Sequence, residues 1–432
     1  MPTCSTSVKS GEEMRRRFTL FALGLVLLTM VSPFVRAQGE ITVTANSYQY
    51  NFAERIVFGL VAESSSEINE ITLTYRVGSE SVTNRAYPEF SPAQRVEAEY
   101  VWRLQRGEIP PGSDIEYYWR IEDAAGNALE TEPITFTYMD DRFTWESLIE
   151  GRIILYWYDA DQAFGRRLLD SAVESLTRLE DNVGVELEKP VKIIVYQSKA
   201  DMQEALISQG AIFEEQIITL GTVVAPDIML LHGTHQDVDV TIAHELTHVV
   251  VHLATDNPYA EIPAWLDEGL AMYNEGKLRS GNAQALKEGI RRNKLLSIRS
   301  LTSMTGNPDE INLFYGEVYS VVDFLLKTYG KEKMSELLKV FKEGSLTDDA
   351  LMKVYGFDQD QLEAQWRESI GAPSQEEAER VDETEAEKPA GGICWGALPG
   401  VALAALPFLF KYQGNSRELR GIHRNGQRGS SP

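Results

Sequence analysis

Two histidines and a glutamate have the types and the spacing of a metal-dependent hydrolytic centre. His244, Glu245 and His248 spell H-E-x-x-H, and the apolar residues around them predict a buried helix over residues 240–253. On such a helix both imidazoles project from one face and can bind a single zinc ion. Glu245 points toward the same cavity, where it can accept a proton from a water molecule that the metal activates.

Such a centre needs a third ligand, and Glu268 follows His248 by twenty positions. Pro263 can open the helix that carries Glu268, which would turn this carboxylate toward the first helix. The longer pattern H-E-x-x-H-x-x-G-x-x-H is excluded, because Val251 and Ala254 stand where it needs Gly and His. Three neighbouring carboxylates are rival ligands: Asp256, Glu261 and Asp267.

The alternative to a metal site is a pair of core histidines with satisfied hydrogen bonds and a capping glutamate. Burying three such polar side chains on one helix face without a partner is costly, which favours a bound cation. His252 shares this face one turn beyond His248. We expect it in the core or in support of a ligand, rather than on the metal.

The motifs H-E-L-T-H and W-L-D-E-G-L-A together resemble the gluzincin metallopeptidases, in particular the bacterial peptidase MA-like domains. The likeness extends over roughly residues 140–371, where F-Y-G-E-V-Y, Y-G-K-E-K and L-E-A-Q-W-R are similar to the helical half of such domains. The resemblance implies a Zn²⁺ cofactor held by His244, His248 and Glu268, with Glu245 as the general base. It also favours Tyr315 as a donor to the oxyanion; Tyr319 and plain packing remain alternatives.

The sequence departs from the family's patterns at two points. The thermolysin-like pattern has an Asp four residues after the glutamate ligand, where it orients the first histidine, and this chain has Met272. The aminopeptidase branch has a G-x-M-E-N-type segment that holds a substrate's free amine, and the chain contains none. The support of His244 and the choice between endopeptidase and exopeptidase therefore stay open.

Residues 40–139 are rich in β-forming residues separated by turn residues, and predict an immunoglobulin-like or fibronectin-III-like β-sandwich. The run Y-Y-W-R-I-E-D-A-A-G-N carries this resemblance; its aromatic side chains are expected in the core. The predicted strands are residues 41–45, 56–62, 71–77, 96–104, 115–121 and 134–138.

Residues 140–372 are predicted to form the zincin (peptidase MA-like) catalytic domain. Its first part has the patterns of four strands and two helices. The strands are residues 153–158, 191–196, 217–224 and 228–231, and the helices are residues 161–179 and 198–209. We expect residues 221–225 to be an edge strand that accepts substrate backbone; an ordinary buried hairpin is the alternative.

Both ends of the chain look like membrane-targeting segments. In residues 1–37, three consecutive arginines precede an apolar run and a small-residue cleavage site, which predicts a signal peptide. An acidic linker at residues 373–392 leads to an apolar run at 393–410 and a basic tail at 411–432, which predict a transmembrane helix and a cytoplasmic tail. A cleaved sorting segment is the alternative. The expected location is an exported, single-pass membrane anchor with the catalytic domain outside the cytoplasm.

The predicted fold class is accordingly multidomain: an N-terminal all-β sandwich, an α+β zincin-like (thermolysin-like) metallopeptidase domain with a helical C-terminal half, and a C-terminal transmembrane helix. The formal net charge of −24 argues against nucleic acid as a partner. Of the two cysteines, Cys4 lies in the signal segment, so no disulfide is expected within the mature chain.

The predicted function is a zinc-dependent metallopeptidase that acts on a peptide or protein and is tethered to the membrane by the C-terminal helix. One alternative is a non-catalytic cell-surface adhesion or scaffold protein with a degenerate zincin domain. Another is a hydrolase of a different amide, with the same site residues.

Overall fold

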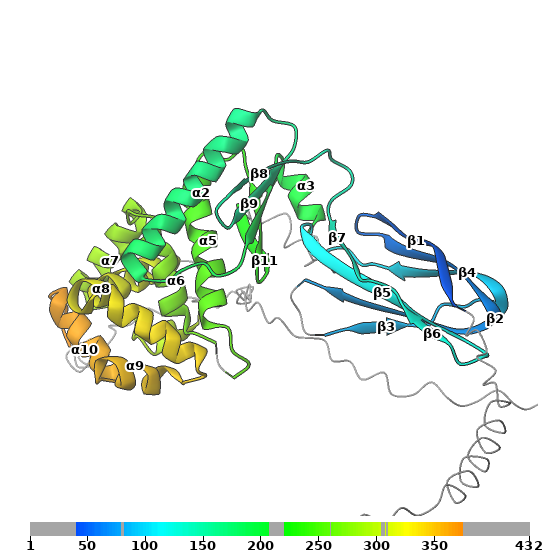
Figure 1. Ribbon diagram of the computed structural model, residues 1–432. Helices are drawn as coiled ribbons and strands as arrows, with labels where there is room; N and C mark the ends of the chain where they lie inside the picture. Colours follow the sequence, from blue (N-terminus) through cyan, green and yellow to red (C-terminus); the bar gives the residue numbers. More distant parts are fainter. Residues whose placement is uncertain are drawn as a thin grey trace, which may run out of the picture. The chain divides into compact units, whose positions relative to one another are not determined.

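A computed structural model describes residues 40–78, 82–206, 220–259, 261–303, 307 and 310–374. The chain divides into two compact units between Arg142 and Phe143. The first is built of strands alone in its described residues, and the second combines a sheet with helices (Figure 1). The predicted signal peptide, apolar run and basic tail, and all but the first two residues of the predicted acidic linker, lie outside the described residues.

The first unit is a seven-stranded antiparallel sheet in which strands follow the order β1-β2-β5-β6. Strands β3 and β4 also pair with β2, and β7 pairs with β5. The strands are β1 (Thr42–Asn51), β2 (Arg55–Val77), β3 (Asn84–Ala86), β4 (Ala93–Arg103), β5 (Ser113–Asp123), β6 (Ala128–Glu130) and β7 (Ile134–Tyr138). Of the aromatic side chains expected in the core, Tyr117 and Trp119 are fully buried and Tyr118 is half-buried; Tyr138 is buried with them.

Strand β2 differs from the prediction, because residues 56–62 and 71–77 belong to one strand of 23 residues. Its first half pairs with β1 and β4, and its second half pairs with β3 and β5. The polar stretch between the halves holds neither Gly nor Pro, so nothing there breaks the extended backbone. Register shifts after Glu63 absorb the change of partner.

The second unit has a five-stranded sheet in the order β11-β12-β10-β9-β8. Strands β9, β10 and β12 run parallel, and β8 and β11 pair antiparallel as the two edges. The strands are β8 (Glu146–Glu150), β9 (Ile153–Trp157), β10 (Val191–Tyr196), β11 (Gly221–Ala225) and β12 (Ile228–His232). The β11–β12 pair is the predicted one, and β11 lies at an edge.

Two helices follow strands of this sheet in the sequence, α2 after β9 and α3 after β10. Helix α2 (Gln162–Val183) begins after Asp161, whose side chain accepts a hydrogen bond from the Phe164 amide. Helix α3 (Lys199–Glu204) begins after Ser198, which caps the Asp201 amide in the same way. Both helices begin one residue after the predicted starts, residues 161 and 198.

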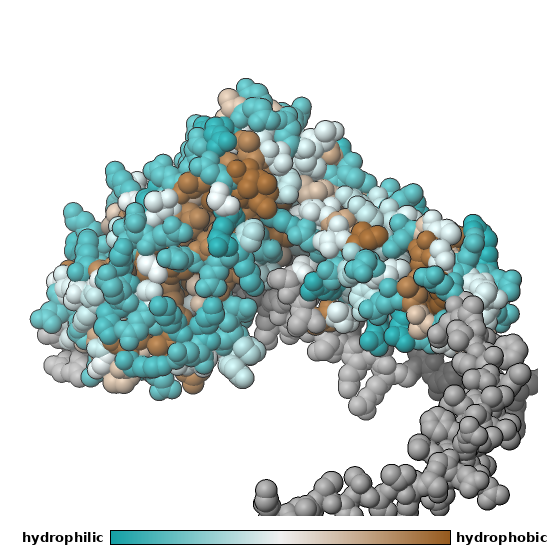
Figure 2. Space-filling view, in the orientation of Figure 1, coloured by the Kyte–Doolittle hydropathy of each residue, from teal (hydrophilic) through white to brown (hydrophobic). Residues whose placement is uncertain are grey.

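The remaining helices form the C-terminal half of the second unit, beside the sheet (Figure 1). They are α5 (Val238–Thr255), α6 (Ala264–Asn274), α7 (Ser280–Arg292), the short η1 (Ser300–Thr302), α8 (Ile311–Lys342), α9 (Thr347–Tyr355) and α10 (Gln359–Ser369). Gly330 interrupts α8 with a φ of 84°, so two helical segments meet there. On the face in Figure 2, hydrophilic side chains cover most of this helical half.

Helix α6 lies very close to α8 at a glycine beside the predicted third ligand. A Cβ at Gly269 would lie 2.6 Å from the Val318 carbonyl oxygen and 2.5 Å from a Val322 methyl group. A side chain at this position would push the two helices apart. Gly269 therefore fixes the depth at which α6, with Glu268, sits in the core.

The predicted fold class is wrong in its membrane-spanning element. Among the described residues, no helix combines the length and the apolar composition that a bilayer crossing requires. The structure is a mixed α/β chain with a β-rich N-terminal unit and a helical C-terminal half. The expected single-pass membrane anchor, and the membrane as a partner, are withdrawn on this finding.

Candidate metal centre

Helices α5 and α6 bring the three predicted zinc ligands together. His244 and His248 lie one turn apart on α5, which covers the predicted helix and extends it at both ends. Glu268 lies on α6, whose N-cap is Pro263 rather than its first residue. The His244 and His248 Nε2 atoms are 3.2 Å apart. The Glu268 Oε2 atom lies 3.5 Å from the first and 3.8 Å from the second.

These distances fit a shared zinc ion. Ligand atoms about 2.0–2.2 Å from a tetrahedral zinc ion lie roughly 3.3–3.6 Å from one another, and the three atoms here are 3.2–3.8 Å apart. The Glu268 Oε2 atom is buried and has no hydrogen-bond partner. A buried carboxylate oxygen without a donor is costly unless a cation compensates it. The donor set of two imidazoles and one carboxylate is one that zinc commonly has.

Each histidine is held from behind by a carboxylate. The His244 Nδ1 atom lies 3.0 Å from Glu275 Oε1, and the His248 Nδ1 atom lies 3.0 Å from Asp267 Oδ1. A carboxylate can only accept here, so both Nδ1 atoms carry the hydrogen. Each Nε2 lone pair is then free to bind a metal, and two such lone pairs cannot hydrogen-bond each other.

The electrostatics of the site also favour a cation. Burial lowers the pKa of His244, but Glu268 and Glu275 outweigh it and raise this pKa to about 10. Burial likewise lowers the pKa of His248, which Asp267 and Glu268 raise to about 9. Burial would raise the pKa of Asp267, yet the charges of His248 and His252 hold it far below its ordinary range. The carboxylates of Glu268, Glu275 and Asp267 thus stabilise positive charge between them.

Glu245 lies beside the metal-binding atoms and against strand β11. Burial raises the pKa of its carboxyl, while the charges of His244 and His248 oppose this rise. A Cβ at Gly221 would lie 2.8 Å from Glu245 Cγ and 2.7 Å from a Thr241 methyl group. Only a glycine lets the strand pass this close to the glutamate side chain.

The two candidate tyrosines have different surroundings. Burial raises the pKa of Tyr315, and the charges of Glu268, Glu245 and Glu275 raise it further. The charges of the site's carboxylates therefore act on Tyr315, and its hydroxyl stays neutral. Burial also raises the pKa of Tyr319, but the next cause is Asp323, on its own helix.

His252 belongs to the support of the site. Its Nε2 atom lies 3.0 Å from Asp267 Oδ2, and its side chain is exposed. His248, His252 and Asp267 form a second group with three possible metal-binding atoms. In this second group, Asp267 hydrogen-bonds both His248 and His252, which accounts for the short distances among the three residues. Of the rival ligands, Asp256 and Glu261 belong to neither of the two groups of possible metal-binding residues. Asp267 pairs with His248 and His252.

Glu275 is a supporting residue that the sequence interpretation did not name, and Asp267, named only as a rival ligand, supports His248. The Glu275 side chain is 1% exposed, and Glu275 directly follows α6 as the C-cap residue. Its spacing of seven from Glu268 was the available signal, because residues seven apart lie on one helix face. At the position where the thermolysin-like pattern has its Asp, Met272 is buried in the core.

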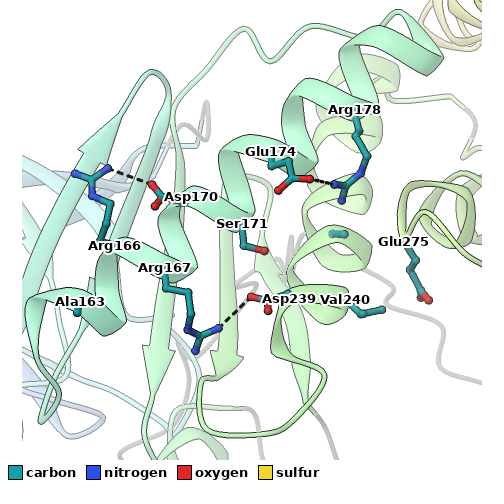
Figure 3. A pocket seen from close by; sticks show the side chains of 11 residues that line it. Ala163, Arg166, Arg167, Asp170, Ser171, Glu174, Arg178, Asp239, Val240 and Glu275 are labelled. Carbon is teal, nitrogen blue, oxygen red and sulfur yellow. Dashed lines mark hydrogen bonds and ion pairs between the residues drawn. The ribbon is translucent and has the colours of Figure 1, made fainter.

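A separate groove of about 620 Å³ lies between α2 and α5. Figure 3 shows that its charged side chains pair with each other, as Arg167 does with Asp239 and Arg178 with Glu174. Glu275 reaches this groove, whereas the three candidate ligands do not line it. The groove lies behind the support of His244 and is distinct from the metal centre.

A model of the peptidase MA superfamily matches residues 171–372. The matched stretch contains α5, α6 and all three candidate ligands. This part of the chain is therefore similar to peptidases of that superfamily. No curated protein matches the chain.

Solved structures are similar to the chain at low identity. An M1 zinc metallopeptidase from Deinococcus radiodurans is 12% identical, with 72% of this chain and 90% of that chain covered and a TM-score of 0.32. OgpA from Akkermansia muciniphila is 10% identical, with coverages of 26% and 32% and a TM-score of 0.18. BhCBM56 is 13% identical, with coverages of 21% and 88% and a TM-score of 0.17. TM-scores this low carry no weight for function.

Proposed function

We propose that this protein is a zinc-dependent peptidase in which His244, His248 and Glu268 hold the metal and Glu245 is the general base. The observation that carries the proposal is the convergence of two Nε2 atoms on the buried, unpartnered Glu268 Oε2 atom. The match to the peptidase MA superfamily supports a peptide or protein as the substrate.

Glu245 would move the proton in the reaction. A bound zinc ion would supply Lewis-acid activation of water and of the scissile carbonyl. The Glu245 carboxylate accepts the proton of the attacking water and then returns it to the leaving amine. Burial raises the pKa of this carboxyl, which is the direction that favours the return of the proton.

Tyr315 would stabilise the negative charge that forms on the scissile carbonyl oxygen. Its raised pKa keeps the hydroxyl protonated, so that it can donate a hydrogen bond. Tyr319 lacks the site's carboxylates among its electrostatic neighbours and is assigned to packing.

Strand β11 would align the substrate. The His232 amide donates to the Leu220 carbonyl, which turns the backbone groups of Leu220 toward β12. In an antiparallel pair these groups alternate in direction, so those of Gly221 and Val223 point to the outer edge. No strand among the described residues pairs with that edge. An extended peptide could add there, beside Glu245.

Replacement of Glu245 tests the proposal. In Glu245→Gln we expect peptide turnover to fall by about 10²–10⁴-fold, the usual share of a general base, with zinc content unchanged. The measurements are mass-spectrometric profiling of a peptide library and metal analysis of the parent and the variant. Undiminished turnover in the variant would refute the role of Glu245. Full zinc occupancy with no cleavage by the parent would favour a non-catalytic protein.

A further inference from the structure

The support of His244 continues outward from Glu275 to an arginine. Arg279 Nε donates to Glu275 Oε2 at 3.2 Å, and its Nη2 atom donates to Oε1 at 3.4 Å. The arginine side chain is exposed, whereas the glutamate is buried. The contacts therefore run from solvent through Arg279 and Glu275 to the His244 ring.

This chain of contacts joins three helices. His244 lies on α5, Glu275 directly follows α6, and Arg279 is the N-cap residue of α7. Gly276, with a φ of 85°, lets the backbone leave α6 in a tight turn. The turn brings Arg279 back over Glu275, so that the local backbone sets the position of the carboxylate.

The partners of the two histidines follow the direction of the helices. His248 pairs with Asp267, and His244, one turn earlier on α5, pairs with Glu275, which comes later in the chain, just beyond α6. Partners that move in opposite directions are what two antiparallel segments require. Met272 is buried in the core, and the carboxylate that reaches the His244 Nδ1 atom is that of Glu275, just beyond the end of α6.

We propose that Glu275, fixed by Arg279, is the positioning residue of His244. The inference rests on the proposed zinc site and assigns to Glu275 the task that the sequence pattern expects at position 272. Without an acceptor at Nδ1, the His244 ring can change tautomer or rotate, and its Nε2 atom no longer points to the shared centre. Loss of Glu275 should therefore weaken zinc binding itself, and not merely the rate of catalysis.

The test is the zinc affinity of full-length variants, measured by competition with a chromogenic chelator. Glu275→Ala should weaken zinc binding by about 10–100-fold. Glu275→Gln should fall between Glu275→Ala and the parent, because the amide oxygen still accepts from Nδ1 but carries no charge. Arg279→Ala should release zinc faster by a few-fold, because the carboxylate loses its outer anchor.

The matched control is Glu288→Gln, which removes a carboxylate that pairs with Arg291 and Arg292 within α7. It should leave zinc affinity unchanged. Thermal unfolding without zinc shows whether each variant folds. If the Glu275 variants do not fold, Arg279→Ala still tests the inference, because Arg279 is exposed. Unchanged zinc affinity and release in the folded variants would overturn it. A parent that binds no zinc would instead refute the proposed function.

Discussion

A buried carboxylate in each unit shows how a structural acid differs from a candidate metal ligand. Asp123, at the end of β5, is 4% exposed and accepts four hydrogen bonds. The donors are the Ser64 hydroxyl, the Asn127 side-chain amide and the backbone amides of Ala125 and Asn127. The Glu268 Oε2 atom on α6 has no donor and faces two imidazoles.

The contrast teaches where each acid is used. The hydrogen bonds from Asn127 and Ser64 lower the pKa of Asp123, and the fixed charge holds a turn together. The Glu268 Oε2 atom has no such donor in the part of the chain that the structure describes, so its charge is available to something the protein binds. A carboxylate that the fold leaves unsatisfied, among converging nitrogen donors, is the stronger indication of a functional site.

The largest expected effect on zinc binding comes from replacing Glu268, the acid without a donor at Oε2. Glu268→Gln should weaken zinc binding by roughly 100–1000-fold, one ligand's share of a typical zinc-binding free energy. A given concentration of zinc should then raise the midpoint of thermal unfolding less than in the parent, because the stabilisation by a ligand depends on its concentration relative to Kd. Both are measured by chelator competition and by thermal unfolding with and without zinc.

Asp123→Ala should show the opposite pattern. The midpoint of unfolding should fall, since four donors lose their acceptor, while zinc affinity stays as in the parent. If Asp123→Ala weakened zinc binding as much as Glu268→Gln, the distinction between the two acids would be wrong.

The next effect concerns Gly221 on strand β11, which lies against the Glu245 side chain. Gly221→Ala should lower peptide turnover by about 10–100-fold, because the new methyl group displaces the Glu245 side chain and misplaced groups lose catalytic power steeply. Zinc affinity should change little, since the ligands are not touched. Steady-state kinetics and metal analysis check both expectations.

Gly281→Ala is the matched control, because its Cβ would meet only Asn312 Oδ1, at 3.9 Å. Turnover in this variant should equal that of the parent. Equal turnover in Gly221→Ala as well would mean that β11 does not constrain Glu245.

The smallest effect concerns a third acid, Glu317 on α8, which is fully buried and has one oxygen without a partner. Burial raises the pKa of Glu317 to about 8, although the Leu296 amide and Arg367 oppose the rise. Glu317 belongs to neither group of candidate metal ligands. We therefore assign it to proton binding rather than metal binding.

The pH dependence of stability tests this assignment. The pKa of Glu317 is higher in the folded chain than its ordinary value of 4.5. The neutral carboxyl thus contributes stability that is fully present below pH 4.5 and is lost as the pH rises through about 8. Glu317→Gln should flatten the fall in unfolding free energy across this window, measured by guanidinium denaturation at a series of pH values. Identical profiles for parent and variant would contradict the prediction.

The sequence allowed much of the site to be predicted, because the chemistry lies in short patterns. Two histidines four apart on an apolar helix must share a face, and α5 has this geometry. Glu268 was found from its place in W-L-D-E-G-L-A, and the glycine beside it proves to govern the close packing of α6 on α8. The roles of His244, His248, Glu268, Glu245 and Tyr315 in binding and catalysis stay predictions.

Other features depended on contacts between distant segments. The single long strand β2 was predicted as two, because its neighbours β4 and β5, and not its own composition, keep the polar middle extended. The predicted membrane helix rested on the apolar run at residues 393–410 and the basic tail after it, and no helix among the described residues could cross a membrane.

The sequence by itself determined which atoms are available to bind a cation and that two of them share a helix face, since helical periodicity is a local property. The tertiary structure decided which acid serves which histidine: Glu268 meets both Nε2 atoms, Asp267 lies behind His248, and Glu275 lies behind His244. The reason is that these pairings depend on how α6 crosses α5, and long-range packing, not spacing along the chain, sets that crossing.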